Sequence, residues 1–151
     1  MKSINNKTFD PRFKPDLTPK QMIKLGVFGG HYFEVATKGV PAEILKLANT
    51  LKSGKKDPKL NYFKISASQS LAVWQKKGWI YDADPNGWFE WYIKYYAGRR
   101  LPKEDERQIK RWIAMRRHIT QVKNNCRAGD VFCRPRQRQA LLHWAYDARK
   151  F

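Results

Sequence analysis

The chain has 151 residues and carries 31 Lys and Arg against 13 Asp and Glu, a formal net charge of +18. Aromatic residues make up 14% of it, which excludes a disordered basic tail, because such tails are poor in aromatic side chains. No apolar run approaches the roughly 18 residues of a membrane helix, and residues 1–16 lack the apolar core of a signal peptide. We therefore expect an intracellular or virion-packaged protein that is not secreted and does not bind membranes.

Helix boundaries are predicted from capping and stop signals along the chain. The segment Thr18–Gln21 combines an N-cap, a first-turn proline and a capping-box glutamine, so it predicts a helix that ends at Gly26. Similar signals predict six helices, at about 19–26, 41–51, 66–77, 84–98, 102–123 and 135–149. Only 27–35 and 60–65 have the pattern of extended segments.

Residues 88–96 hold six aromatic side chains in nine positions. A helix that is apolar nearly all round is usually a central, buried one. We therefore expect an all-α fold, a single compact domain of five to six helices around this aromatic-rich helix, with little or no sheet. The domain would cover 1–151, with an extended N-terminal arm at 1–17 and an Arg-rich helical part at 99–151. The alternative is an aromatic platform on which nucleic-acid bases stack.

The positive charge changes in kind along the chain. Residues 1–98 hold 15 Lys and one Arg against eight acids, whereas residues 99–151 hold 11 Arg and four Lys against five acids. The planar fork of arginine suits phosphate oxygens and base edges better than the point charge of lysine. The C-terminal third is therefore predicted to bind nucleic acid, DNA in preference to RNA, largely by phosphate contacts.

Three parts of this region carry the prediction. Arg99 and Arg100 fall in an expected turn, where both are free to reach outward, and the helix expected over 102–123 places a basic face beside an apolar one. The segment 134–139 is built like a recognition helix, in which Arg pairs with guanine and Gln with adenine. The candidate nucleic-acid-binding residues are Arg99, Arg100, Arg107, Lys110, Arg111, Arg117, Arg134, Arg136, Gln137 and Arg138. A solvated basic face without a ligand is the competing interpretation.

Four residues are of the types that bind zinc: His118, Cys126, Cys133 and His143. Their spacing matches no standard zinc finger, so two free thiols and two ordinary histidines explain them better. We therefore expect no cofactor, with zinc as the less favoured alternative. A Cys126–Cys133 disulfide fits a short loop but is not expected inside a cell.

Catalytic signals are scarce, because the chain has no Walker A loop, nucleophile elbow, His-Glu-x-x-His motif or Rossmann fingerprint. A non-enzymatic protein is favoured, and no catalytic residue is predicted. Two alternatives remain open. One is an enzyme that modifies or processes nucleic acid with an aromatic base pocket, and the other is a structural component of a virion or ribonucleoprotein.

The segments 84–100 and 105–112 read DPNGWFEWYIKYYAGRR and DERQIKRW. They resemble a small uncharacterised family of basic proteins from bacteria, plants and fungi, built around a DPxGWFxWYxxYYxGRR…DxRQIxRW core. The resemblance implies no established activity. It implies that Arg99, Arg100, Arg107 and Gln108 lie together with Trp88 and Trp112. This group would be either a binding site or a structural cluster in which arginines stack on tryptophans.

Overall fold

The computed structural model describes residues 9–27, 39–51, 62–64, 84 and 87–151, with backbone alone at 48–51. These parts contain the helices α1 (Pro19–Lys24), α2 (Ala42–Leu51), α4 (Trp88–Tyr96), α5 (Pro102–Ala114), α6 (Arg116–Asn125) and α7 (Pro135–Leu142). No strand occurs among the described residues, so the predicted all-α class is confirmed for them. The helix predicted at 66–77 and most of the two extended segments lie outside the described residues.

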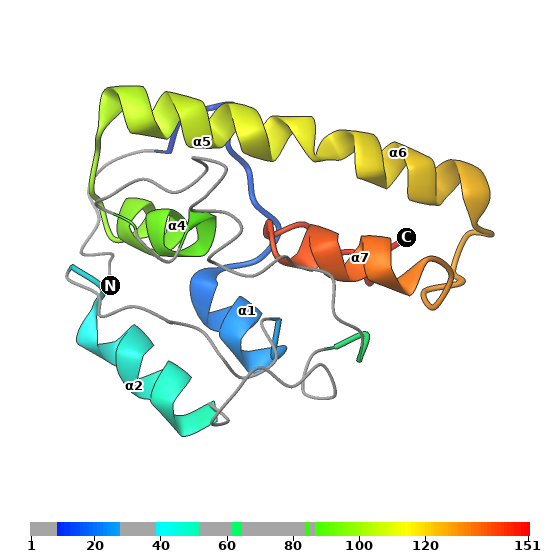
Figure 1. The fold of residues 1–151 in the computed structure, drawn as a ribbon, viewed down its shortest axis with the longest axis horizontal. Coiled ribbons are helices and arrows are strands. Elements are labelled where there is room, and N and C mark those ends of the chain that lie inside the picture. The colour runs from blue at the N-terminus through cyan, green and yellow to red at the C-terminus, as the bar shows by residue number, and fades with distance from the viewer. Residues whose placement is uncertain (1–8, 28–38, 52–61, 65–83, 85–86) are drawn as a thin grey trace.

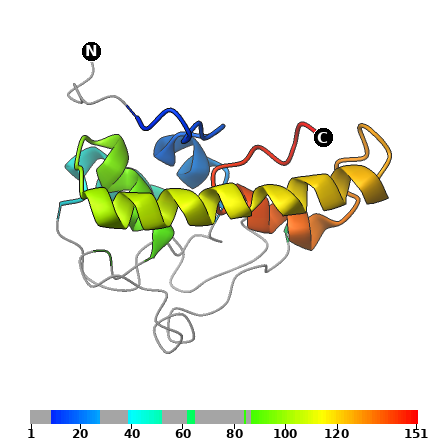
Figure 2. The same cartoon turned by 90° about the horizontal axis from the view of Figure 1, so that it is seen from above.

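The helices lie in three tiers (Figure 1). α5 and α6 run end to end along one edge, α4, α1 and α7 lie beneath them, and α2 lies on the far side of α1. Seen from above, α5 and α6 form one nearly straight rod, and the loop after α6 is at the end of the molecule away from α4 and α2 (Figure 2). None of the described helices is both long and apolar enough to cross a membrane.

Helix α1 begins as its capping signal predicts. The Gln21 backbone N–H donates to the Thr18 hydroxyl at 3.2 Å, and the Thr18 N–H donates to the Gln21 side-chain oxygen at 2.8 Å. This reciprocal pair satisfies two N–H groups that would otherwise lack partners at the start of a helix. Helix α2, with Ala42 as its first residue, likewise agrees with the prediction of a helix opened by Pro41.

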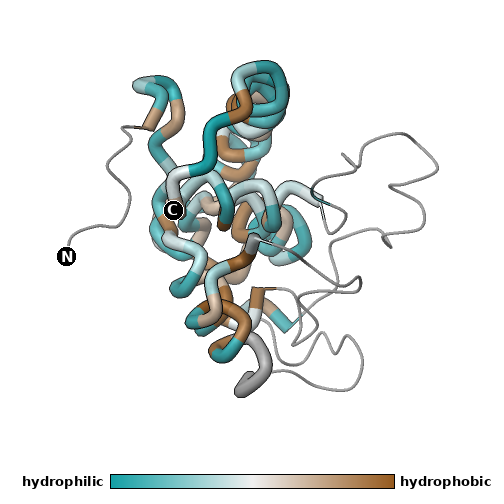
Figure 3. The backbone as a smooth tube through the Cα atoms, turned by 90° about the vertical axis from the view of Figure 1, so that its left-hand side faces the viewer, coloured by the Kyte–Doolittle hydropathy of each residue, from teal (hydrophilic) through white to brown (hydrophobic). Residues whose placement is uncertain are grey.

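Helix α4 forms the centre of the aromatic core. All its side chains except that of Tyr96 are buried, and Phe13 inserts edge-on among the rings of Trp88, Tyr92 and Trp112. Brown and teal positions alternate along the described helices (Figure 3), as expected for helices that bury one face. The prediction that the aromatic residues of 88–96 form core is therefore confirmed.

The helix predicted over 102–123 is divided in two at Met115. The Met115 N–H donates to the Trp112 carbonyl at 3.2 Å, a tightened i to i+3 bond. The Tyr146 hydroxyl donates to the same carbonyl at 2.5 Å. A side chain from the C-terminal segment, residues 143–151, therefore occupies an acceptor of the helix's backbone hydrogen bonds. Insertion of a side chain into the ladder is a known cause of helix breaks. The local sequence carries no signal for it.

The end predicted for the last helix is wrong. The prediction extended it over 135–149, whereas α7 ends at Leu142. Ala145 adopts the left-handed conformation with φ +65°. The Tyr146 N–H donates to the Leu141 carbonyl and the Ala145 N–H to the Leu142 carbonyl, both at 3.1 Å. These are the two bonds of a Schellman motif. Since alanine replaces the usual glycine at the left-handed position, the sequence gives no stop signal here.

Candidate nucleic-acid interface

Three of the four cations of α5 have partners within the protein, whereas Lys103 is exposed. Arg107 forms a bidentate pair with Glu104, with both N–O distances 2.8 Å, and Lys110 lies 3.3 Å from Glu106. Arg111 donates to the Gln108 side chain at 3.0 Å and lies over the Trp144 ring. Burial lowers the pKa of Arg111 to about 10. These three predicted binding residues already have partners and add little free positive charge to the surface.

Arg99 and Arg100 were expected to reach outward from a turn, and this expectation is wrong. Arg99 forms a bidentate pair with the buried Asp84 carboxylate, at 2.8 and 2.7 Å, and Lys94 lies 3.1 Å from the same carboxylate. Arg100 lies with its guanidinium carbon 3.7 Å from the centre of the Tyr95 ring and donates to the Tyr95 carbonyl. The structural interpretation of these arginines therefore fits better than the binding one, because buried carboxylates need partners.

The charge is different in the segment 116–136, which we call the basic hairpin. It comprises α6, the loop 126–134 and the start of α7. Its exposed charged residues are Arg116, Arg117, Lys123, Arg127, Arg134 and Arg136 on the positive side and Asp130 on the negative side. Six cations against one acid leave this surface strongly positive, unlike α5.

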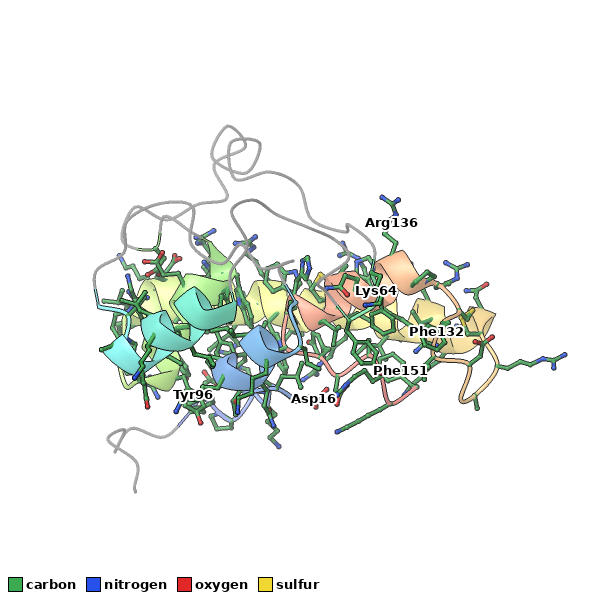
Figure 4. All side chains as sticks on the ribbon, turned by 90° about the horizontal axis from the view of Figure 1, so that it is seen from below. Asp16, Lys64, Tyr96, Phe132, Arg136 and Phe151 are labelled. Atoms are coloured by element: carbon green, nitrogen blue, oxygen red, sulfur yellow. A yellow bond between two sulfur atoms is a disulfide. The ribbon has the colours of Figure 1, made fainter. Side chains whose placement is uncertain are left out.

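None of the six cations of the basic hairpin has an acidic partner among the described residues, and three of them also make no side-chain contact with a ring or an amide: Arg117, Arg127 and Arg136. Arg136 projects outward from α7 (Figure 4). Two others lie over aromatic rings, Arg116 over Trp112 at 5.0 Å and Lys123 over Phe151 at 5.4 Å. Arg134 makes a long contact of 3.4 Å with the Gln137 side chain. All six cations keep their charge accessible to solvent.

Arg138 and Gln139 lie inside the protein. The prediction that the segment 134–139 presents its side chains to bases is therefore wrong for these two residues. Arg138 is 0% exposed and donates to the carbonyls of Cys133, Asp130 and Ala148, at 2.5, 2.9 and 2.9 Å. Gln139 donates to the Val27 carbonyl at 2.8 Å. Because a helix turns 100° per residue, Arg138 points about 200° away from the exposed Arg136 and therefore toward the inside of the protein. Neither buried side chain can contact a ligand in this structure.

Gln137 and His118 hold α6 and α7 together. The Gln137 amide nitrogen lies 2.9 Å from His118 Nδ1 and donates to the Gln121 side chain at 2.5 Å. Burial, and then the nearby charge of Arg117, lower the pKa of His118 below its ordinary value of 6.5. The ring is therefore neutral at pH 7 and can accept from Gln137. Gln137, predicted to read bases, is used in this interhelical contact.

Cys126 and Cys133 form a disulfide, so the expectation of two free thiols is wrong. Because α6 and α7 pack antiparallel, the Cα atoms of the two cysteines lie 5.9 Å apart, which is within the range found for disulfides. His118 instead contacts Gln137, and His143 Nε2 lies 3.3 Å from Gln139. Within the described part of the chain, no three His, Cys, Asp or Glu residues come together as a metal site.

The aromatic base pocket of the enzyme alternative is not formed by α4, because its rings pack on one another. Trp88 lies 4.9 Å from Trp144, and Trp91 lies 4.9 Å from Tyr95, measured between ring centres. The Trp91 indole N–H donates to the buried Asp105 carboxylate at 2.8 Å. These rings are therefore occupied in the core.

Sequence reasoning missed four exposed residues of the basic hairpin: Arg116, Lys123, Arg127 and Phe132. A signal for the three cations was present, because residues 107–129 contain no acid at all. A helix without acids cannot neutralise its own arginines, whereas α5 has three acids beside its cations. No such signal marks Phe132 as exposed.

In comparisons with known proteins, no protein-family model, no curated protein and no solved structure matches the chain.

Proposed function

We propose that the protein binds nucleic acid, DNA first of all, through phosphate contacts from the basic hairpin. The observation that carries the proposal is the division of charge between neighbouring helices. Three of the four cations of α5 are paired with acids or packed on a ring, whereas Arg117, Arg127 and Arg136 have no acid partner among the described residues. Unpaired arginines on one surface are the usual footprint of a polyanion-binding site.

The neutral side chains of α6 also fit this function. Thr120, Gln121 and Asn124 are exposed beside Arg117 and Lys123, and the helix carries no acid. Hydroxyl and amide groups donate to phosphate and sugar oxygens alongside arginine and lysine in protein–DNA complexes. An exposed arc of cations and neutral polar groups therefore suits a nucleic-acid backbone better than it suits an apolar partner.

The proposal is tested by measuring affinity for duplex DNA, single-stranded DNA and RNA between about 50 and 200 mM salt. We expect log affinity to fall linearly with log salt. Arg117→Ala, Arg127→Ala and Arg136→Ala, combined in one variant, should reduce the slope on duplex DNA by up to about 2.7, because each phosphate contact contributes about 0.9.

The matched control removes three exposed lysines outside the basic hairpin, as Lys14→Ala, Lys24→Ala and Lys103→Ala combined. It lowers the net charge by the same amount, so a general charge effect would reduce the slope equally in both variants. Equal slopes in the two variants would contradict the proposed surface. No binding of the wild-type protein to any of the three ligands at low salt would contradict the function itself.

A further inference from the structure

Phe132 is an exposed aromatic side chain in the loop of the basic hairpin. It is 69% exposed, compared with 44% for Tyr96 and 39% for Tyr62. Tyr96 packs against Phe9, and Tyr62 packs against Phe63. Every other described aromatic residue is either buried or in contact with a ring or a cation, whereas Phe132 has no such contact among the described residues. Its phenyl ring is therefore available to a ligand.

The backbone that carries Phe132 is firmly held. The next residue, Cys133, is joined to Cys126 by the disulfide, and the Cys133 carbonyl accepts from the buried Arg138 at 2.5 Å. Arg138 also donates to the Asp130 carbonyl at 2.9 Å, on the other side of Phe132. A ring on a backbone tied down on both sides loses little freedom on binding, which favours affinity.

The charges near Phe132 in the sequence are mainly positive, with Asp130 as the one acid of the loop. The loop 126–134 has Arg127 near one end and Arg134 at the other, and Arg136 follows in the first turn of α7. A phosphate chain that contacts these arginines would place its bases close to the phenyl ring. Base–aromatic stacking between phosphate contacts is the general mode by which proteins bind single strands.

We propose that Phe132 is a stacking residue for an unpaired nucleobase, so that the preferred ligand of the basic hairpin is a single strand or a duplex with an exposed base. This inference rests on the proposed nucleic-acid binding and specifies its ligand. A regular duplex offers no free base face unless a step is unstacked, which costs energy. The unpaired base supplies that face directly.

An anionic membrane surface also attracts a cationic loop with an exposed aromatic ring. The loop has no second large apolar side chain, since its other apolar residues are the small Ala128 and the half-buried Val131. Stable membrane binding needs more apolar area than one phenyl ring provides. The nucleobase is therefore the better match, and vesicles serve as a contrasting ligand in the test.

The experiment measures binding of a short oligothymidine and of an abasic strand of equal length, which keeps the phosphates and lacks the bases. We expect Phe132→Ala to weaken oligothymidine binding roughly 5- to 150-fold and to leave binding of the abasic strand unchanged. Phe132→Tyr should restore binding, because it keeps the ring, whereas Phe132→Leu should stay weak. The triple arginine variant should weaken binding of both strands.

The outcomes separate the stacking role of Phe132 from nucleic-acid binding itself. If the wild-type protein binds both strands equally and Phe132→Ala changes neither affinity, the stacking role is wrong while phosphate binding stands. Failure of the wild-type protein to bind either strand would overturn the proposed function itself. If Phe132→Ala abolishes binding to phosphatidylserine vesicles but not to oligothymidine, the ring is a membrane contact. Circular dichroism is the control for folding, and each Phe132 variant should give the wild-type spectrum because the ring is exposed.

Discussion

The guanidinium of Arg138 satisfies three backbone carbonyls, from Asp130, Cys133 and Ala148. These carbonyls belong to the loop of the basic hairpin and to the C-terminal segment, so one side chain joins two stretches that come from either side of α7. Arg136, two residues earlier, is also an arginine, but its side chain is exposed to solvent. The difference is positional, because successive residues of a helix point in directions 100° apart.

We expect Arg138→Ala to lower the free energy of unfolding by about 3 kcal/mol or more, because charge-assisted bonds are lost and carbonyls are left without donors. Arg138→Lys should also destabilise the protein, since an ammonium group cannot span the same three acceptors. Arg136→Ala, the control on the same helix, should change stability by no more than about 0.5 kcal/mol. Urea titration followed by tryptophan fluorescence measures all three. Equal effects of Arg138→Ala and Arg136→Ala would contradict the structural role.

Helices α6 and α7 form a unit held by three kinds of interaction at different points along its length. The disulfide closes the loop end, the Gln137–His118 contact joins the middle, and the Tyr146 hydroxyl bonds the Trp112 carbonyl where α6 meets α5. Val122 is the one fully buried residue of α6, and Leu141 and Leu142 are buried on α7. The position of the exposed arginines and of Phe132 therefore depends on polar and covalent contacts as well as on apolar packing.

Reduction of the disulfide should destabilise the protein by about 2–3 kcal/mol, because the unfolded chain regains the entropy of a short closed loop. For a chain of this length we expect the melting temperature to fall by about 4–12 °C. A calorimetric scan of the wild-type protein with and without reductant measures the shift. The double variant Cys126→Ser and Cys133→Ser should melt at one temperature in both conditions. An unchanged wild-type melting temperature, with mass spectrometry showing the bond reduced, would contradict the expectation.

At the scale of the whole molecule, the segment 9–17 ties distant parts of the chain together. The Tyr92 hydroxyl donates to the Leu17 carbonyl at 2.5 Å, and the Asp16 N–H donates to the Ala145 carbonyl at 2.8 Å. Phe13 lies among rings of α4 and α5. The described part of the expected N-terminal arm is thus non-helical, with a turn closed by the Phe13 N–H and the Asp10 carbonyl, and it packs into the core beside Ala145.

Phe13→Ala should lower the free energy of unfolding by about 3–5 kcal/mol, because it removes a buried ring from a tightly packed centre. Phe13→Leu should cost less, since it keeps most of the apolar volume. Lys14→Ala changes the exposed neighbouring residue and should stay within about 0.5 kcal/mol of the wild-type protein. Denaturant unfolding compares the three variants. If Phe13→Ala is no worse than Lys14→Ala, the segment is not part of the core.

The fold was predictable where its signals are local. Thr18 and Gln21 are close in sequence and cap α1 as expected, and the aromatic density of 88–96 predicts the core helix. The helix break at Met115 was not predictable, because its cause is the hydroxyl of Tyr146. The early end of α7 was missed because Ala145 takes a conformation usually signalled by glycine.

The candidate site was predictable as a region and only partly as residues. Arg117, Arg134 and Arg136 are exposed as expected, whereas Arg99 and Arg107 bind acids and Arg138 binds carbonyls. The i,i+3 spacing of Glu104 and Arg107 indicates their pairing within one helix, whereas Asp84 reaches Arg99 only after the chain has folded. For Arg99 and Arg138, exposure depends on where acids and carbonyls outside their own helical turn come to lie.

The sequence by itself determined the helical class, the starts of the capped helices and the amount of positive charge in the last third of the chain. These properties follow from interactions between residues within one or two helical turns, and from composition. Only the tertiary structure decided which arginines are free, that Cys126 pairs with Cys133, and that Phe132 is exposed between arginines. Those properties depend on contacts across loops and between separate helices, and such contacts exist only once the helices have packed.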